Sequence, residues 1–271
     1  MQLTYDSDAA RSPALHELRE LWRYRDLLKL LISNSIKTRY KRSTLGILWT
    51  LLNPLLNTLV LTIAFSQIFR FDVKNYTVYL LVGFVTWNLM SQTTTQSMYT
   101  LIWRSSLLKR IYLPRTIFAV SVAGNGLINF FLALVPLALV MLVMRHPFTP
   151  ALLLLPAAIL ILVMFTLGLS LLLSTLAVFF ADVVDMYGVF LTIWFYLTPV
   201  IYPISIVPEK FAPIIKLNPM TVMVDIFRSI IYLGETPPVQ AWLITASLSI
   251  ATLIIGWLVF TKQVDELAYR I

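Results

Sequence analysis

The chain has 271 residues, of which 59% are hydrophobic and 13% charged, and its mean hydropathy is +0.82. A soluble domain carries about 25% charged residues, so this composition leaves too little polar surface to cover a water-soluble particle. The composition predicts an all-α, polytopic membrane protein. The net charge of +8 would suggest nucleic acid in a soluble chain, but here the basic residues flank apolar stretches, so no nucleic-acid partner is expected.

The first 42 residues are predicted to form a cytoplasmic tail and an amphipathic interface helix, and residues 43–271 a single transmembrane domain. Over residues 14–42, helical spacing places Leu21, Tyr24, Leu28, Leu31 and Ile32 on one face and Arg19, Arg23, Asp26, Lys37 and Lys41 on the other. Such a helix lies on the anionic inner leaflet, in contact with membrane lipids. The same charges also suit a simple anchor that orients the chain.

Six uncharged windows follow, each longer than the roughly 20 residues that a helix needs to cross the hydrocarbon core. They place six transmembrane helices near residues 47–69, 77–99, 116–144, 151–180, 186–202 and 240–261. Asn53 and Pro54 predict a kink in the first, because proline removes a backbone hydrogen bond. Of the 21 lysines and arginines, 15 fall on the side that holds both termini, so both termini are expected in the cytoplasm.

The cytoplasmic half of the second predicted span is polar from Asn88 to Ser97. Facing lipid, these side chains would be costly, so they either join helices together or line a pore. Aromatic residues in the second and fifth spans suit either a belt at the membrane interface or a pore on which sugars stack. The candidate pore-lining residues are Trp87, Gln92, Gln96, Tyr99, Trp194 and Tyr196.

Residues 101–115 form a short basic stretch, LIWRSSLLKRIYLPR, that Pro114 ends. Leu107, Leu108 and Ile111 recur at helical spacing, and a plain loop would not need these apolar residues. The pattern predicts a short cytoplasmic helix that docks on a partner. Its candidate docking residues are Arg104, Leu107, Leu108, Lys109, Arg110 and Ile111.

The stretch from Pro199 to Pro238, which leads from the fifth span to the sixth, holds seven of the 14 prolines, yet it is apolar. Two short helices fit it, near residues 208–216 and 219–233, with Asn218 as N-cap and Pro219 at the first position of the second helix. Each is too short to cross a membrane, so a hairpin that dips into the outer leaflet and returns is expected. An ordinary extracellular loop is the alternative.

Several kinds of chemistry are missing from the sequence. There is no phosphate-binding P-loop, no cysteine and no metal-ligand spacing, so neither a cofactor, a metal site nor a catalytic residue is predicted. The six predicted spans hold no Asp, Glu, Lys or Arg. Ion-coupled transporters place ionisable groups there, so a transporter of this composition needs a separate chain as its energy source.

Two segments carry a resemblance to a known family. YRDLLKLLISNSIKTRYKRSTLGILWTLLNPLL resembles the N-terminal signature of ABC-2 type permeases of the polysaccharide-export group, and LLKRIYLPR resembles the cytoplasmic segment between their second and third spans. FFADVVDMYGVFLTIWFYLTPVIYP and LNPMTVMVDIFRSIIYLG are similar to later landmarks. The resemblance covers about residues 20–261. One departure is Ala181, where the family often has a basic residue, which weakens an ionic contact between this loop and an ATPase.

The resemblance implies a half-transporter in the bacterial cytoplasmic membrane. Two copies would pair above two ATP-binding cassette subunits, which would contact the interface helix and residues 104–113. Lipid-linked polysaccharide of the O-antigen, capsule or teichoic-acid type would be the cargo. Its headgroup would be attracted to the interface helix through Arg25, Lys37, Arg39, Lys41 and Arg42. The hairpin would form an outer gate with Tyr202, Pro203, Asn218 and Pro219.

Two alternatives remain from the sequence. An ABC-2 permease for a drug or a small lipid would share the low charge of the spans. A membrane-embedded glycosyl or phosphoryl transferase would need carboxylates or a metal at the membrane surface, and Asp182 and Asp185 are the only close acidic pair in a loop between spans.

Overall fold

The computed structural model describes residues 13–40, 48–64, 75–103, 114, 116–180 and 182–263. All regular elements in these ranges are helical. They are α1 (Pro13–Arg23), α2 (Arg25–Tyr40), α3 (Leu48–Ile63), α4 (Tyr76–Trp103), α6 (Thr116–Val143), η3 (Pro150–Leu154), α7 (Leu155–Phe179), α8 (Val183–Leu197), η4 (Ile204–Ile206), α9 (Ala212–Leu217), α10 (Pro219–Arg228), the π-helical η5 (Ser229–Leu233) and α11 (Val239–Lys262).

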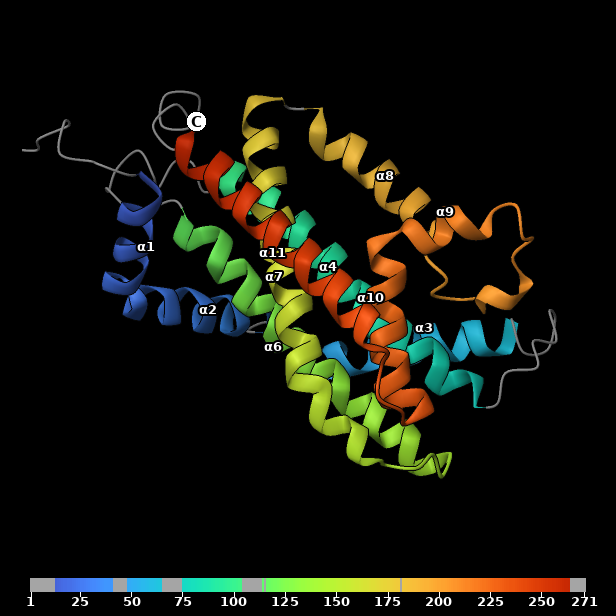
Figure 1. Ribbon diagram of the computed structural model, residues 1–271. Helices are drawn as coiled ribbons and strands as arrows, with labels where there is room; N and C mark the ends of the chain where they lie inside the picture. The colour runs from blue at the N-terminus through green and yellow to red at the C-terminus, as the bar shows by residue number, and fades with distance from the viewer. Residues whose placement is uncertain are drawn as a thin grey trace, which may run out of the picture.

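Four long helices, α4, α6, α7 and α11, run side by side and form the body of the protein (Figure 1). Helix α4 packs against both α6 and α7, and α11 covers α7. Helix α8 leaves the bundle, and its main contacts with the long helices are to α4 and α7. Many of its apolar side chains are therefore exposed, as lipid or a protein partner requires.

The crossing of α7 and α11 depends on two glycines. A methyl group added at Gly168 would lie 2.5 Å from the carbonyl carbon of Thr252, and one added at Gly256 would collide with the carbonyl of Gly168. Each contact is with backbone, which has little freedom to move aside. Small residues at a helix crossing let the two backbones approach closely, which is how helices associate in a bilayer.

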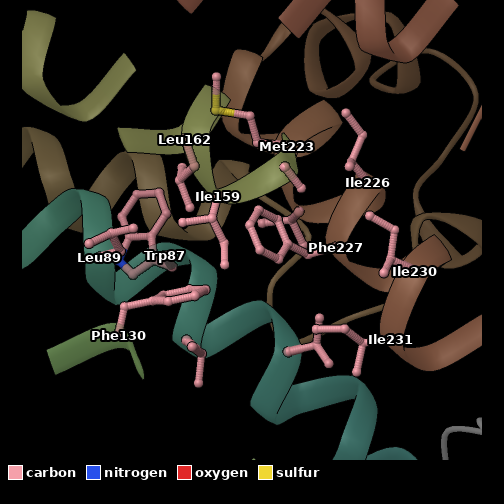
Figure 2. Packing of buried hydrophobic residues seen from close by; sticks show 14 of the residues in the cluster. Trp87, Leu89, Phe130, Ile159, Leu162, Met223, Ile226, Phe227, Ile230 and Ile231 are labelled. Carbon is pink, nitrogen blue, oxygen red and sulfur yellow. The ribbon is translucent and has the colours of Figure 1, made fainter. Parts of the chain in front are cut away.

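Helix α10 is inserted into the core, although it is only ten residues long. Met220, Met223, Val224, Ile226 and Phe227 are all buried. Figure 2 shows Phe227 and its neighbours on α10 facing Trp87 of α4, Phe130 of α6 and Ile159 of α7. The apolar residues of α10 are thus explained by burial inside the bundle, whereas apolar side chains of the preceding α9 are exposed.

The prediction of a polytopic helical membrane protein is confirmed. Three helical stretches, Thr116–Val143, Pro150–Phe179 and Val239–Lys262, are long and apolar enough to cross a membrane. Helix α4 has 28 residues, whereas α3 and α8 have 16 and 15. The number of six spans remains a prediction. The fifth span, expected near 186–202, is helical only over Val183–Leu197, because Pro199 disfavours helix in the residue before it.

The N-terminal amphipathic helix is divided in two at Tyr24 (Figure 1). Its predicted faces are confirmed for the described residues. The apolar set of five lies half-buried, and Arg19, Arg23, Asp26 and Lys37 are exposed. Ile32 of α2 packs on Gly124 of α6, where an added methyl group would lie 2.6 Å from the isoleucine Cδ1. The helix therefore docks on the bundle as well as presenting charge.

Candidate functional site

A polar cleft of about 530 Å³ opens between α2, α4 and α6. Half of its lining residues come from the polar half of α4, and the others are Ser35 of α2, Leu191 of α8 and one face of α6. Its lining residues are Ser35, Ser91, Gln92, Thr93, Thr95, Gln96, Tyr99, Thr100, Ser121, Val122, Asn125, Gly126, Asn129 and Leu191. A volume of this size is typical of small-molecule sites.

The face that α6 presents to the cleft follows from helical spacing. Ser121, Asn125 and Asn129 recur every four residues and so lie one above another. Gly126 allows α4 to come close, because a methyl group there would collide with the hydroxyl of Thr93. The two helices thus touch at Thr93 and Gly126, and polar side chains of both line the cleft.

Two polar atoms in the wall of the cleft are buried without a hydrogen-bond partner. They are Oγ1 of Thr93, whose side chain is 2% exposed, and Oδ1 of Asn125. A buried polar atom without a partner costs about 1–3 kcal/mol. All the polar groups that line the cleft are neutral hydroxyls and amides. The cleft is therefore suited to a neutral ligand that can donate and accept hydrogen bonds.

The interface helices are attached to the start of α6, at the same end of the bundle as the cleft. The hydroxyl of Thr116 donates a hydrogen bond of 2.5 Å to Oε2 of Glu17, which is buried on α1. Together with the packing of Ile32 on Gly124, this contact joins α1 and α2 to α6. A displacement of α2 would therefore move one wall of the cleft.

At the opposite end of the bundle, Arg228 of α10 holds the segment that follows α8. Its Nη1 donates to the carbonyl of Pro199 at 2.6 Å and its Nη2 to that of Val200 at 2.7 Å. The guanidinium also stacks over the ring of Tyr79, with Cζ 3.5 Å from the centroid. Both carbonyls and the aromatic face stabilise the cation in a buried site.

Three more side chains hold the same segment. Tyr76 and Tyr79 of α4 donate their hydroxyls to the carbonyls of Ile201 and Tyr202, at 2.6 and 3.0 Å. Asn218 accepts the indole N–H of Trp194 at 2.8 Å and donates to Oγ1 of Thr198 at 2.8 Å. We call Tyr76, Tyr79, Asn218 and Arg228 the outer clamp. It fixes residues 198–202 to α4 and α10.

The predicted pore-lining residues are found in three settings. Gln92, Gln96 and Tyr99 meet in the polar cleft. Trp87 lies in the core, with its ring centroid 5.8 Å from that of Trp194, and Trp194 is half-buried. Tyr196 is 63% exposed on α8. These positions describe one chain, and the pore role of all six stays a prediction.

Of the predicted outer-gate residues, Asn218 is the N-cap of α10, as expected, and its side chain accepts the backbone N–H of Met220. Pro219 is the first residue of that helix, and Tyr202 and Pro203 are half-exposed. Arg25 and Lys37 are exposed. The remaining predicted headgroup and docking residues lie outside the residues or side chains that the structure describes. They are Arg39, Lys41, Arg42, Arg104, Leu107, Leu108, Lys109, Arg110 and Ile111.

Sequence reasoning missed Arg228, Tyr76 and Tyr79. Arg228 was counted only as one charge in an extracellular connection. The available signal was its surroundings, since a single arginine within the apolar run MTVMVDIFRSIIYL needs buried partners. Within the described part of the chain, no three His, Asp or Glu residues come together as a metal site would require.

A helical bundle with spanning helices and a polar cleft between them has the organisation of a membrane transport subunit. A sequence model of the ABC-2 type transporter family matches residues 26–232, and the chain belongs to this family. It is 33% identical over 258 residues to the O-antigen export system permease protein RfbA of Myxococcus xanthus, covering 94% of this chain and 98% of that protein. Two Klebsiella pneumoniae proteins of the same description are 33% and 32% identical to this chain. Each match covers 77% of this chain and 81% of the Klebsiella protein.

Proposed function

We propose that this chain is the membrane subunit of an ATP-driven exporter that moves lipid-linked polysaccharide across the bacterial cytoplasmic membrane. The observation that carries the proposal is the similarity to an O-antigen export permease over nearly the full length of both chains. The neutral polar cleft supports it, since hydroxyls and amides suit a glycan better than an apolar drug.

The working assembly in this proposal contains two copies of the chain and two ATP-binding cassette subunits. The ATP-binding subunits contact α1, α2 and residues 104–113, and their closure moves α2 against α6. Arg25, Lys37, Arg39, Lys41 and Arg42 attract the anionic headgroup of the cargo at the inner surface. All six predicted helices cross the membrane, and α9 with α10 forms the hairpin at the outer leaflet.

Deleting the gene tests the export function. Cells that lack the chain are expected to accumulate the lipid-linked glycan inside and to lose it from the surface, and the wild-type chain restores it. A variant with Lys109→Glu and Arg110→Glu should reach the membrane at normal levels yet export less than a tenth as much, because reversed charges repel a docking surface. Fractionated glycan, measured by gel and immunoblot, is the readout. Unchanged surface glycan in the deletion strain would overturn the proposal.

The orientation can be tested separately, because the chain contains no cysteine and each introduced one reports alone. Lys210 and Lys216 are exposed at the hairpin end of the bundle. Lys210→Cys and Lys216→Cys should react with a membrane-impermeant maleimide added to intact cells. Gln263→Cys, at the end of α11, is the matched control and should react only after the cells are opened. The reverse pattern would mean that the termini face outward.

A further inference from the structure

We propose that the polar cleft binds a neutral, hydroxyl-rich group, namely a sugar unit of the exported glycan, within a single copy of the chain. The inference rests on the proposed function, because it states which part of the cargo occupies this cleft. It adds a binding site at the α2–α4–α6 junction and separates the position of the sugar from that of the charged headgroup.

The charge of the lining decides between the sugar and the phosphate. A phosphate is bound through arginine, lysine or a cluster of backbone N–H groups. The lining residues of the cleft carry hydroxyls and side-chain amides, and none of them is charged. Hydroxyls both donate and accept hydrogen bonds, as do the carboxamides of Gln92, Gln96 and Asn125, and a sugar ring presents the same groups.

The two atoms without partners point to the same ligand. Oγ1 of Thr93 and Oδ1 of Asn125 lie on facing helices, α4 and α6, and both residues line the cleft. Leaving them unpaired destabilises the empty protein. Both atoms are closed to solvent in the empty protein, so a ligand hydroxyl reaches them only when α4 and α6 move slightly apart; it can then donate to Asn125 and accept from Thr93, which returns that free energy on binding.

The remaining walls provide an apolar surface and a moving part. Tyr99 is 41% exposed at the cleft, and its ring offers a flat face for the apolar side of a sugar ring. Ser35 places α2 in the wall, and Arg39 follows Ser35 by one helical turn. A headgroup held at the basic end of α2 would therefore keep its first sugar within reach of the cleft, and a movement of α2 would open or close it.

Protection of a single cysteine tests this site. Gln92→Cys supplies a reporter in the wall, and the full chain is used in nanodiscs with its ATP-binding subunits. The probes are oligosaccharide released by mild acid from the host's own lipid-linked glycan, and inorganic pyrophosphate. The oligosaccharide is expected to slow modification of the cysteine in a saturable manner, and pyrophosphate at the same concentration is not.

Thr93→Val then removes one of the unpaired hydroxyls without changing the volume of the side chain. Its stability should be unchanged or raised, because the lost hydroxyl had no partner, so weaker protection cannot be attributed to misfolding. The oligosaccharide concentration for half-protection should rise about fivefold. Thr166→Val is the matched control, since Thr166 is also buried and unpaired but lies on α7 away from the cleft. It should leave protection unchanged.

Three outcomes overturn the inference. The first is protection by pyrophosphate but not by the oligosaccharide. The second is no protection by either probe, which would mean that the cleft holds only water. The third is an equal effect of Thr93→Val and Thr166→Val on protection. Each leaves the proposed function standing if deletion of the gene still abolishes export. Conversely, normal export in the deletion strain together with saturable protection would overturn the proposed function and retain a sugar site.

Discussion

Replacing Arg228 with methionine is expected to lower the free energy of unfolding by about 3 kcal/mol. Methionine fills much of the same space but leaves the carbonyls of Pro199 and Val200 without their donors, at a site where Arg228 is 5% exposed. The stacking over Tyr79 is lost as well. The measurement is unfolding of the purified chain in mixed micelles, followed by tryptophan fluorescence.

Two comparisons separate the outer clamp from a general effect of charge. Arg228→Lys keeps the charge, but an ammonium cannot make the paired donation and the flat stacking together, so an intermediate loss is expected. Lys210→Met removes an exposed cation outside the outer clamp and should change stability by less than about 0.5 kcal/mol. In addition, a cysteine placed at Ile201, which is 8% exposed, should react faster once Arg228 is replaced. Unchanged stability together with unchanged reactivity would show that the clamp does not hold residues 198–202.

The sequence predicted well those features that depend on neighbours along the chain. The faces of α1 and α2, the polar half of α4 and the N-cap at Asn218 all follow from spacing or from local hydrogen bonding. The interface helix nevertheless bends at Tyr24, and α9 begins at Ala212 rather than at 208. Boundaries of this kind depend on tertiary contacts that local propensity does not contain.

The candidate site was predicted only on one side. Gln92, Gln96 and Tyr99 stood out because polar groups in a span are costly, but the opposite wall was not recognised. Ser121, Asn125 and Asn129 are separated by apolar residues in a long apolar helix, so their shared face emerges only when α6 lies against α4. Likewise, the outer clamp joins α4 to residues 201 and 202 across more than 120 residues of sequence, and no local pattern indicates that pairing.

The close backbone packing of α7 against α11 was also not apparent from the sequence. A search for two glycines four residues apart finds none, because Gly168 and Gly256 lie on different helices and meet only at the crossing of α7 and α11. A single small residue in an apolar helix has no distinguishing pattern. Its role becomes clear from what an added methyl group would strike, which here is the backbone of the partner helix.

Replacing Gly256 with valine is therefore expected to have the largest effect on folding of any single change proposed. Even its Cβ would collide with the carbonyl of Gly168, and the two further methyl groups must separate α11 from α7. Overpacking typically costs about 1–3 kcal/mol where side chains can move. Because backbone resists here, we expect a loss of at least about 3 kcal/mol, with little of the chain recovered from the membrane in folded form.

A graded series tests whether the crossing is the cause. Gly256→Ala should lie between wild type and Gly256→Val, because one methyl group forces a smaller separation of the helices. Gly188→Ala on α8 is the matched control, since a methyl group there meets nothing within 4 Å and alanine favours helix over glycine by about 1 kcal/mol. Its unfolding midpoint should stay level or rise. If Gly256→Val and Gly188→Ala unfolded at the same denaturant concentration, the separation of α7 and α11 would not lower the free energy of unfolding. Close backbone packing would then not be what joins these two helices.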